Sequence, residues 1–207
     1  MKRYSIFNLF FKKRIMALSG LIGSSLLLTA CAGTSGFSWS SLSPSNWFSH
    51  ALEVSELGIG GVNKQTDMNL SAIKQGLDNR YRLRSGMEIK NGKLFSVVQG
   101  MEAGQVRIEL SGQNHGKVDK IIILDEKVKT IWGTKIGMPF STVYDKAYGS
   151  CHHSGDSTMQ QKVICVAPQS RNISYVFTGI WNGSEELMPP DDVLRTWKVS
   201  GIIWKAK

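Results

Sequence analysis

The first thirty residues restrict what the rest of the chain can fold into. They hold five basic residues and no acidic one: Lys2, Arg3, Lys12, Lys13 and Arg14. An apolar run of 14 residues follows, from Ile15 to Leu28. A basic segment before a short apolar run is typical of a secretory signal. The run is too short for a bilayer-spanning helix, which needs about 20 residues. We therefore expect residues 1–30 to be cleaved, and the remainder to fold outside the cytoplasm.

The end of the apolar run carries a more specific motif. Leu28, Thr29, Ala30 and Cys31 resemble the lipobox of bacterial lipoproteins. The resemblance implies cleavage before Cys31, with acyl chains such as palmitate added to its thiol and its new amino group. Several acyl chains anchor a protein stably, since each buried CH₂ contributes ~0.8 kcal/mol. An ordinary signal peptide with an incidental cysteine is the alternative. By the same resemblance Ala32, in place of Asp, favours the periplasmic face of the outer membrane.

Cleavage would leave two regions of different composition. The mature chain would begin with a lipid-anchored tether, residues 31–50, whose positions 32–50 contain seven Ser, two Gly and one Pro. Such composition is typical of a flexible linker. Four aromatic residues are unusual there, and they would dock on the domain or at the lipid interface: Phe37, Trp39, Trp47 and Phe48. Residues 51–207 are enough for one periplasmic domain with a core of its own.

The charge of the mature chain is mild. Of the 25 basic residues of the whole chain, five lie in the signal, which leaves 20 against 16 acidic residues, a net charge of +4. This excess does not predict a nucleic-acid partner, and the expected compartment argues against one. A weak attraction to anionic headgroups or to a phosphorylated glycolipid is an alternative consequence of the excess. The membrane, reached through the lipid on Cys31, is the expected partner, and an envelope protein is a second.

The segment 150–165 contains the side chains best suited to chemistry. They are Ser150, Cys151, His152, His153, Asp156 and Cys165. With Cys31 lipidated, Cys151 and Cys165 are an even pair in an oxidising compartment, which predicts a disulfide. A metal site is a weaker alternative because the spacing matches no common zinc pattern, and adjacent histidines on an extended chain point to opposite sides. A Ser-His-Asp hydrolase is weaker still, because no nucleophile motif accompanies these residues. We predict no metal and no cofactor.

The stretch "RYRLR" is the sharpest charged feature of the domain. On a strand, Arg80, Arg82 and Arg84 would share one face and leave Tyr81 and Leu83 on the other. A solvated face, or a charged edge strand that resists aggregation, explains this pattern. The functional alternative is a ridge that binds an anion or an acidic partner.

The remaining pattern predicts an α+β fold with a mostly antiparallel sheet. Four segments have strand character, 104–112, 117–125, 162–168 and 172–180, and turn residues separate the first two. Two or three short helices are expected. Leu70, Ile73 and Leu77 form one apolar stripe over 69–77. A second helix over 140–149 would begin at Ser141 and end at Gly149, and a third would begin in 189–197.

Two pairs of segments resemble each other and suggest tandem repeats. Residues 71–77 align with 141–148, and "KVDKIIIL" at 117 aligns with "KVSGIIWK" at 198. We therefore expect two helix-plus-sheet units within one domain. The motif "KIGMPFSTVY" at 135–144 resembles the strand, turn and helix start of small secreted modules, including the β-lactamase inhibitor protein. Most of these modules bind other proteins.

Several motifs together resemble a known family. They are "YRLRSGM" (81–87), "KIGMPFS" (135–141), Cys151 with Cys165, "ISYVF" (173–177), "LMPPDD" (187–192) and "WKVSGIIWK" (197–205). From about Leu70 to its end, the chain resembles a family of Gram-negative outer-membrane lipoproteins of unknown function (domain of unknown function 1131). Expression of that family is tied to the envelope-stress sigma factor (RpoE). The resemblance implies a periplasmic lipoprotein domain and brings no catalytic residue.

Three functions fit these features. The first, which we expect, is a non-enzymatic binding module in envelope maintenance or stress, using the arginine ridge and any exposed tryptophan. The tryptophans concerned are Trp132, Trp181, Trp197 and Trp204. The second is an envelope hydrolase that uses carboxylates from Asp145, Asp156, Glu185, Glu186, Asp191 and Asp192. The third is a carrier that holds a lipid or glycolipid against the sheet.

Overall fold

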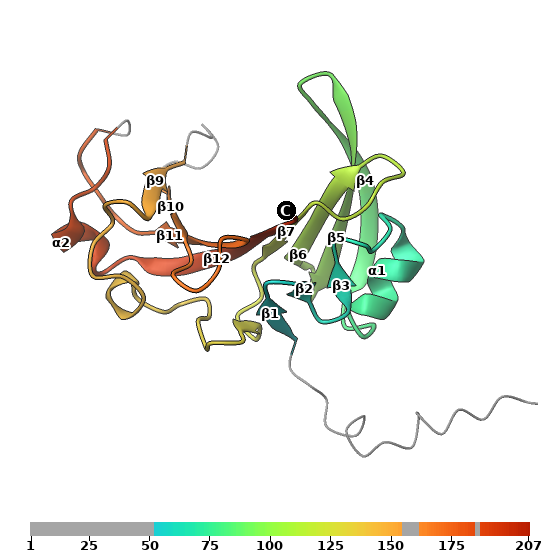
Figure 1. Cartoon of the computed structure of the whole chain (residues 1–207), viewed down its shortest axis with the longest axis horizontal. Helices are drawn as coiled ribbons and strands as arrows, with labels where there is room; N and C mark the ends of the chain where they lie inside the picture. Colours follow the sequence, from blue (N-terminus) through green and yellow to red (C-terminus); the bar gives the residue numbers. More distant parts are fainter. Residues whose placement is uncertain (1–51, 155–161, 185–186) are drawn as a thin grey trace, which may run out of the picture. The chain divides into compact units, whose positions relative to one another are not determined.

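The structure is a computed structural model that describes residues 52–154, 162–184 and 187–207. The chain divides into two compact units, Met1–Pro44 and Ser45–Lys207, and every described element belongs to the second. This unit consists mostly of antiparallel β-sheet (Figure 1). The predicted sheet class is thus confirmed, while helices contribute less than expected.

An eight-stranded sheet dominates the unit, and all its neighbouring strands are antiparallel. In spatial order its strands are β4 (Arg82–Lys90), β5 (Lys93–Glu102), β6 (Gln105–Gln113), β7 (Lys120–Ile123), β12 (Lys198–Lys205), β11 (Ile173–Thr178), β10 (Lys162–Val166) and β9 (Cys151–His153). Tight hairpins join β4 to β5 and β5 to β6. Asn91 and Gly92 have φ values of 50° and 73°, and Ala103 and Gly104 have 49° and 78°. Two successive positive φ angles are typical of two-residue hairpin turns.

The strand order is symmetric about the centre of the sheet. Strands β4 to β7 follow one another in chain order from one edge of the sheet to its centre. Strands β9 to β12 do the same from the opposite edge. In the alignment of "KVDKIIIL" with "KVSGIIWK", Ile122 is equivalent to Ile203, and these two residues are direct partners in the β7–β12 pair. The strand order is therefore symmetric about the Ile122–Ile203 pair, although the predicted repeat of a helix plus a sheet does not extend to the helix of the second unit.

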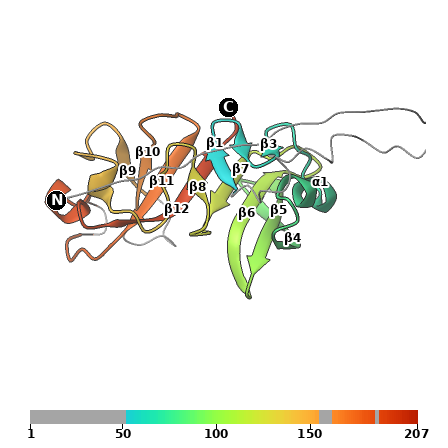
Figure 2. The same cartoon turned by 90° about the horizontal axis from the view of Figure 1, so that it is seen from below.

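A second, small sheet packs on one face of the large one (Figures 1 and 2). Its strands, in the order β3-β2-β1-β8, are β3 (Val62–Asn63), β2 (Gly58–Ile59), β1 (Glu53–Ser55) and β8 (Lys129–Thr130). Trp204 of β12 donates its indole N–H to the carbonyl oxygen of Glu56 at 2.9 Å, which ties the two sheets together. The sequence pattern did not predict this sheet, because strands of two or three residues are too short to show periodicity.

The helical predictions are only partly correct. α1 (Leu70–Gly76) is confirmed: Asn69 caps it by accepting from the N–H of Ala72, and Ile73 is buried. α2 (Asp191–Leu194) is a single turn. The helix predicted over 140–149 is wrong, since only the 3₁₀ turn η3 (Phe140–Thr142) forms there, with Pro139 as its N-cap residue instead of Ser141. Tertiary contacts replace the helix, as Tyr144 donates to the carbonyl oxygen of Val166 at 2.6 Å.

One hydrophobic core fills the space between the large sheet, the small sheet, α1 and α2. Its largest fully buried side chains include Trp197, Trp204, Tyr175, Phe140 and Phe177. Phe140 and Phe177 make an edge-to-face contact with ring centroids 5.0 Å apart. No helix within the described ranges is long and apolar enough to cross a membrane.

Candidate binding face

The register of the large sheet separates a covered face from an open face. Side chains alternate between the two faces along each strand, and directly paired residues share a face. One row on the open face crosses seven strands through Arg84, Gln99, Glu109, Ile122, Ile203, Ser174 and Val166. In the part of the chain that the structure describes, no helix or strand covers this face (Figure 1).

The centre of the open face is apolar. Ile203 and Val176 are only 5% and 6% exposed, yet neither belongs to the hydrophobic core cluster. Leu124 extends the same surface. Gly201 is the direct partner of Val176, and a Cβ atom on Gly201 would lie 3.4 Å from the Cδ2 atom of Leu124, so the Leu124 side chain lies over the same face. The apolar strip is completed by Ile122, Ile164 and Val166. Ile203 and Val176 are themselves buried, and the exposed members of the strip are Leu124 and Val166, at 38% and 37%, which make the strip a candidate binding surface.

A ladder of polar side chains borders the apolar strip on the β4 side. Arg84 donates to Oε1 of Gln99 at 2.6 Å, and Gln99 donates to Oε2 of Glu109 at 2.8 Å. These side chains line an open groove of about 430 Å³, together with Glu88 and Val97 among others. The hydrogen bonds fix the Arg84 guanidinium above the sheet, and some of its N–H groups remain able to bind a ligand.

The open face is strongly basic. By strand register its basic residues are Arg82, Arg84, Lys90, Lys93, Lys120, Lys162, Lys198 and Lys205. Its acidic residues at described strand positions are Glu88 and Glu109, and Glu88 already pairs with Lys90 at 2.8 Å. Although the mature chain is nearly balanced in charge, its basic residues are concentrated on this face. Such a surface attracts acidic ligands.

Lys120 shows the effect of this concentration. It lies directly opposite Lys205 in the β7–β12 pair. Burial, and then the positive charges of Lys90 and Lys205, lower the pKa of Lys120 below its ordinary value. An anionic group bound near these lysines would relieve their mutual repulsion.

The predicted arginine ridge is only partly correct. Arg82 and Arg84 share the open face of β4, but Arg80 lies before the strand begins. The chain enters β4 from the turn after α1, where Asp78 and Asn79 adopt positive φ angles of 52° and 57°. Arg80 therefore does not belong to the alternating pattern. The sequence interpretation also missed Lys120, which lies within the first "K-V-x-x-I-I" segment, and Lys205, which lies two residues after the second.

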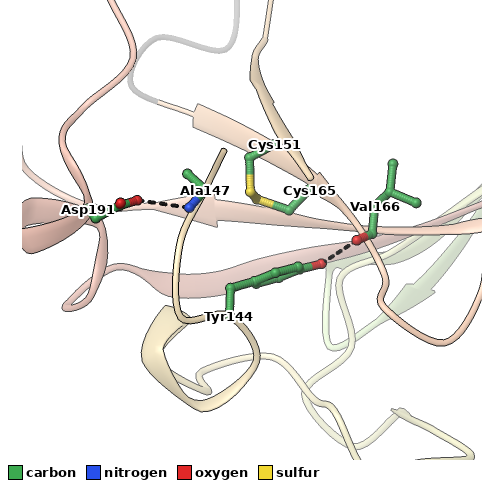
Figure 3. Close-up of a disulfide and its surroundings, with 6 residues drawn as sticks. All are labelled: Tyr144, Ala147, Cys151, Cys165, Val166 and Asp191. Carbon is green, nitrogen blue, oxygen red and sulfur yellow. Dashed lines mark hydrogen bonds between the residues drawn. A yellow bond between two sulfur atoms is a disulfide. The ribbon is translucent and has the colours of Figure 1, made fainter. Parts of the chain in front are cut away.

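The disulfide prediction is confirmed. Cys151 and Cys165 are bonded, with their sulfur atoms 2.03 Å apart, and they face each other across the β9–β10 pair (Figure 3). His152 and His153 lie at alternate positions of β9, paired with Ile164 on the open face and Val163 on the covered face. They therefore point to opposite sides of the sheet. Within the described residues no three His, Cys, Asp or Glu side chains gather as a metal site, and Asp156 lies outside those residues.

The tryptophans are not the exposed binding residues that the sequence analysis considered. Trp197 and Trp204 are 2% and 1% exposed and belong to the core. Trp132 and Trp181 are partly buried against the same core, and Trp132 donates to the hydroxyl of Tyr175 at 2.6 Å. Large aromatic side chains thus stabilise the covered face, and the open face depends on aliphatic and basic residues.

Of the six candidate carboxylates, Asp145, Asp191 and Asp192 lie within the described residues. Asp191 accepts a hydrogen bond from the backbone N–H of Ala147 at 2.8 Å (Figure 3). This contact holds the segment before the disulfide against α2, which is a structural role. Asp156, Glu185 and Glu186 lie outside the described residues.

The N-terminal predictions also fall outside the described part of the chain. They concern the lipobox Leu28, Thr29, Ala30 and Cys31, and the tether that follows it. Lipidation and the membrane location therefore remain predictions from sequence.

Comparisons with known proteins place the fold among proteins of unknown function. The sequence model of a family described as "Protein of unknown function (DUF1131)" matches residues 36–206. The uncharacterized protein YfeY of Escherichia coli K12 is 42% identical over 180 residues, which cover 87% of this chain and 93% of YfeY. A crystal structure of yfeY from Escherichia coli has a TM-score of 0.68 at 40% identity, and the match covers 74% of this chain and 99% of the crystallised one.

Proposed function

The chain belongs to this DUF1131 family. We propose that it is a non-enzymatic binding module of the bacterial envelope. Its open face holds an acidic segment of an envelope protein. A lipid on Cys31 keeps it at the periplasmic face of the outer membrane. The family resemblance predicted from sequence is confirmed, whereas regulation by RpoE and a role in envelope stress remain part of the proposal.

The observation that carries this proposal is the composition of the open face. An apolar strip lies beside a basic surface, and no described helix or strand covers either. Apolar side chains supply binding free energy when they leave water, at about 25 cal/mol per Å². Basic side chains steer and orient an acidic partner. The combination suits a protein segment that has both acidic and apolar side chains.

The form of the face favours a protein partner over a carried lipid. Lipid carriers enclose acyl chains in an apolar cavity. The groove at the polar ladder is instead open, and Arg84, Glu88 and Glu109 are among its lining residues. A protein segment can lie across such a surface with its charged groups still in water.

The non-enzymatic part of the proposal is supported by the roles of the polar residues. Gln99 and Glu109 belong to the ladder, and Asp125 accepts from the hydroxyl of Tyr81 at 2.7 Å inside the core. These groups have structural partners that account for their positions.

In-cell cross-linking of the full-length lipoprotein, followed by capture and mass spectrometry, tests the proposal. We expect one abundant envelope protein with an acidic segment. Its capture should be lost in the charge-reversal variant Arg82→Glu, Arg84→Glu, Lys205→Glu.

A matched control reverses three exposed basic residues that lie off the sheet: Lys74→Glu, Arg195→Glu and Lys146→Glu. It changes the net charge equally and should retain the partner. Equal capture by both variants, or capture of a lipid or glycan in place of a protein, would contradict the proposal. Mass analysis of the N-terminal peptide tests lipidation of Cys31 separately.

A further inference from the structure

The hairpin formed by β4 and β5 extends beyond the rest of the sheet. β4 and β5 pair as far as Lys90 and Lys93, next to the turn. β6 pairs with β5 only from Phe95 onward, where Gln113 is the partner of Phe95. The tip therefore has no third strand beside it, and Figure 1 shows it standing clear of the other described elements. Its turn, Asn91–Gly92, is of the tight two-residue type whose twist matches that of the paired strands.

The two sides of this tip differ in chemistry. Met87, Ile89 and Leu94 are 70%, 74% and 41% exposed, and they share the side of the hairpin that corresponds to the covered face. Lys90 and Lys93 occupy the other side. The tip is thus amphipathic, and its apolar side chains are exposed where no core packing requires them. Apolar groups exposed together in this way mark an interaction surface.

The basic side of the tip continues into the lysines of the sheet. Lys120 and Lys205 are direct cross-strand partners. They belong to a row of paired residues that crosses the sheet from Lys120 to Ser111, Val97 and Gly86. We define the hairpin end as Met87, Ile89 and Leu94 together with Lys90 and Lys93; Lys120 and Lys205 lie on β7 and β12, level with Gly86 and not at the tip.

We propose that the hairpin end docks on the anionic lipid headgroups of the membrane that anchors the protein. The apolar side chains of the tip enter the headgroup region, and the lysines contact the lipid phosphates. This inference rests on the proposed lipid anchor but not on the proposed protein partner. Amphipathic elements bind bilayers by apolar insertion combined with attraction to anionic lipids.

Charge decides between a membrane and a second copy of the chain as the occupant. Residues 87–94 contain two lysines and a single acidic residue, Glu88, which already pairs with Lys90. Two copies meeting through this end would bring lysines against lysines. An anionic bilayer has the complementary charge over its whole surface, so every lysine of the hairpin end gains from the contact.

The tether is long enough for this contact. It contains residues 31–50, and 20 extended residues span at most roughly 66–72 Å. The ten residues of β5 span only about 33 Å. A protein anchored through Cys31 can therefore turn its hairpin end to the bilayer that holds its lipid.

The test places a fluorophore on the tip of the complete lipoprotein. Ile89→Cys, labelled with an environment-sensitive dye, provides the only free thiol if Cys31 is acylated and Cys151 is bonded to Cys165. The protein is reconstituted into phosphatidylcholine vesicles with or without phosphatidylglycerol. The control carries the dye at Ile180→Cys, where the native side chain is 83% exposed and lies after β11.

We expect the dye at position 89 to shift to the blue and to be quenched by brominated acyl chains, only when phosphatidylglycerol is present. The dye at position 180 should not respond. A lysine near an anionic surface contributes about fivefold to binding, so Lys90→Gln with Lys93→Gln should lower the ratio of docked to undocked protein about 25-fold. The same signal at both positions would overturn the inference, as would a shift at position 89 that depends on protein concentration without vesicles.

Failure of this inference can be distinguished from failure of the proposed function. A wrong anchor would appear as an unmodified Cys31 in mass analysis and would leave the thiol free for labelling. A wrong protein partner would leave the fluorescence result unchanged, because the vesicles contain only this protein.

Discussion

Substitution of two adjacent isoleucines tests whether the large sheet has one covered and one open face. Ile202 and Ile203 are neighbours in β12, with exposures of 0% and 5%. Their side chains point to opposite faces, since Ile202 pairs with Ile123 of the core and Ile203 pairs with Ile122. Ile202→Ala and Ile203→Ala therefore remove the same atoms from two environments that differ only in what covers them.

The structure sets different costs for the two changes. Each removes three carbons, worth about 2.4 kcal/mol at ~0.8 kcal/mol per buried CH₂. At Ile202 a cavity remains inside the core, which raises the expected loss to about 3–5 kcal/mol. Ile203 is also buried but lies outside the core cluster, so we expect neighbouring side chains to relax into the space, and the loss is then the transfer contribution alone, about 2.4 kcal/mol. The difference is about 1–2 kcal/mol, or about 2–8 °C in Tm for a domain of this size.

Urea unfolding of the two variants, followed by circular dichroism, measures this difference. Ile203→Ala should be the more stable variant, and it should still lose the cross-linked partner because the apolar strip is weakened. Equal losses of stability in the two variants would refute the assignment of an open face. That result would mean that the second face is buried as deeply as the first.

Two further predictions concern the core and the disulfide. Reduction of the Cys151–Cys165 bond, with a sequence separation of 14, should lower the free energy of unfolding by about 3 kcal/mol, because the closed loop restricts the unfolded chain; the double variant Cys151→Ala, Cys165→Ala should not respond to reductant in the same urea assay. Burial, and then its hydrogen bond to Asp125, raise the pKa of Tyr81 far above the ordinary 10.0, so its stabilising contribution is present below about pH 10 and is lost as pH rises above that value. Tyr81→Phe should cost about 1–3 kcal/mol at neutral pH, since the buried Asp125 carboxylate loses a donor, and should make alkaline unfolding less steep; a parallel pH profile in both proteins would contradict this.

The parts of the fold that the sequence predicts are those with strong local signals. Ile73 and Leu77 have helical spacing and are both buried in α1 or at its end. The pairing of Cys151 with Cys165 follows from compartment and parity, and the structure contains that bond. The antiparallel class follows from the strand-like segments, whereas the symmetric strand order was not predicted. The helix and the strands are indicated by a few neighbouring residues each, and the disulfide by the number of cysteines and the expected compartment.

The parts that could not be predicted depend on contacts between distant segments. Residues 140–149 have a helical pattern. The Tyr144 hydroxyl, however, donates a hydrogen bond to the Val166 carbonyl oxygen, and the backbone N–H of Ala147 donates one to the Asp191 carboxylate. These contacts stabilise an irregular loop in place of a helix. The run "IIIL" likewise fits a buried strand in any register, so the sequence does not say that Ile122 faces away from the core. Only the pairing with Ile203 shows this.

The symmetric strand order of the sheet explains why the open face combines two kinds of chemistry. Its two halves share a strand order, but their outer strands carry different residues. On the β4 side the open face presents Arg82 and Arg84, whereas Ile164 and Val176 occupy it near the opposite edge. Repetition can supply an uncovered sheet, and divergence of the two copies can then give the first half five basic side chains and place most of the apolar strip on the second, which still has Lys162, Lys198 and Lys205. A ligand bound across the central Ile122–Ile203 pair would meet both halves at once. Its acidic and apolar groups would have to lie in a fixed order along the ligand. The side chains of the face therefore select one orientation of the ligand, which the symmetric backbone alone would not do.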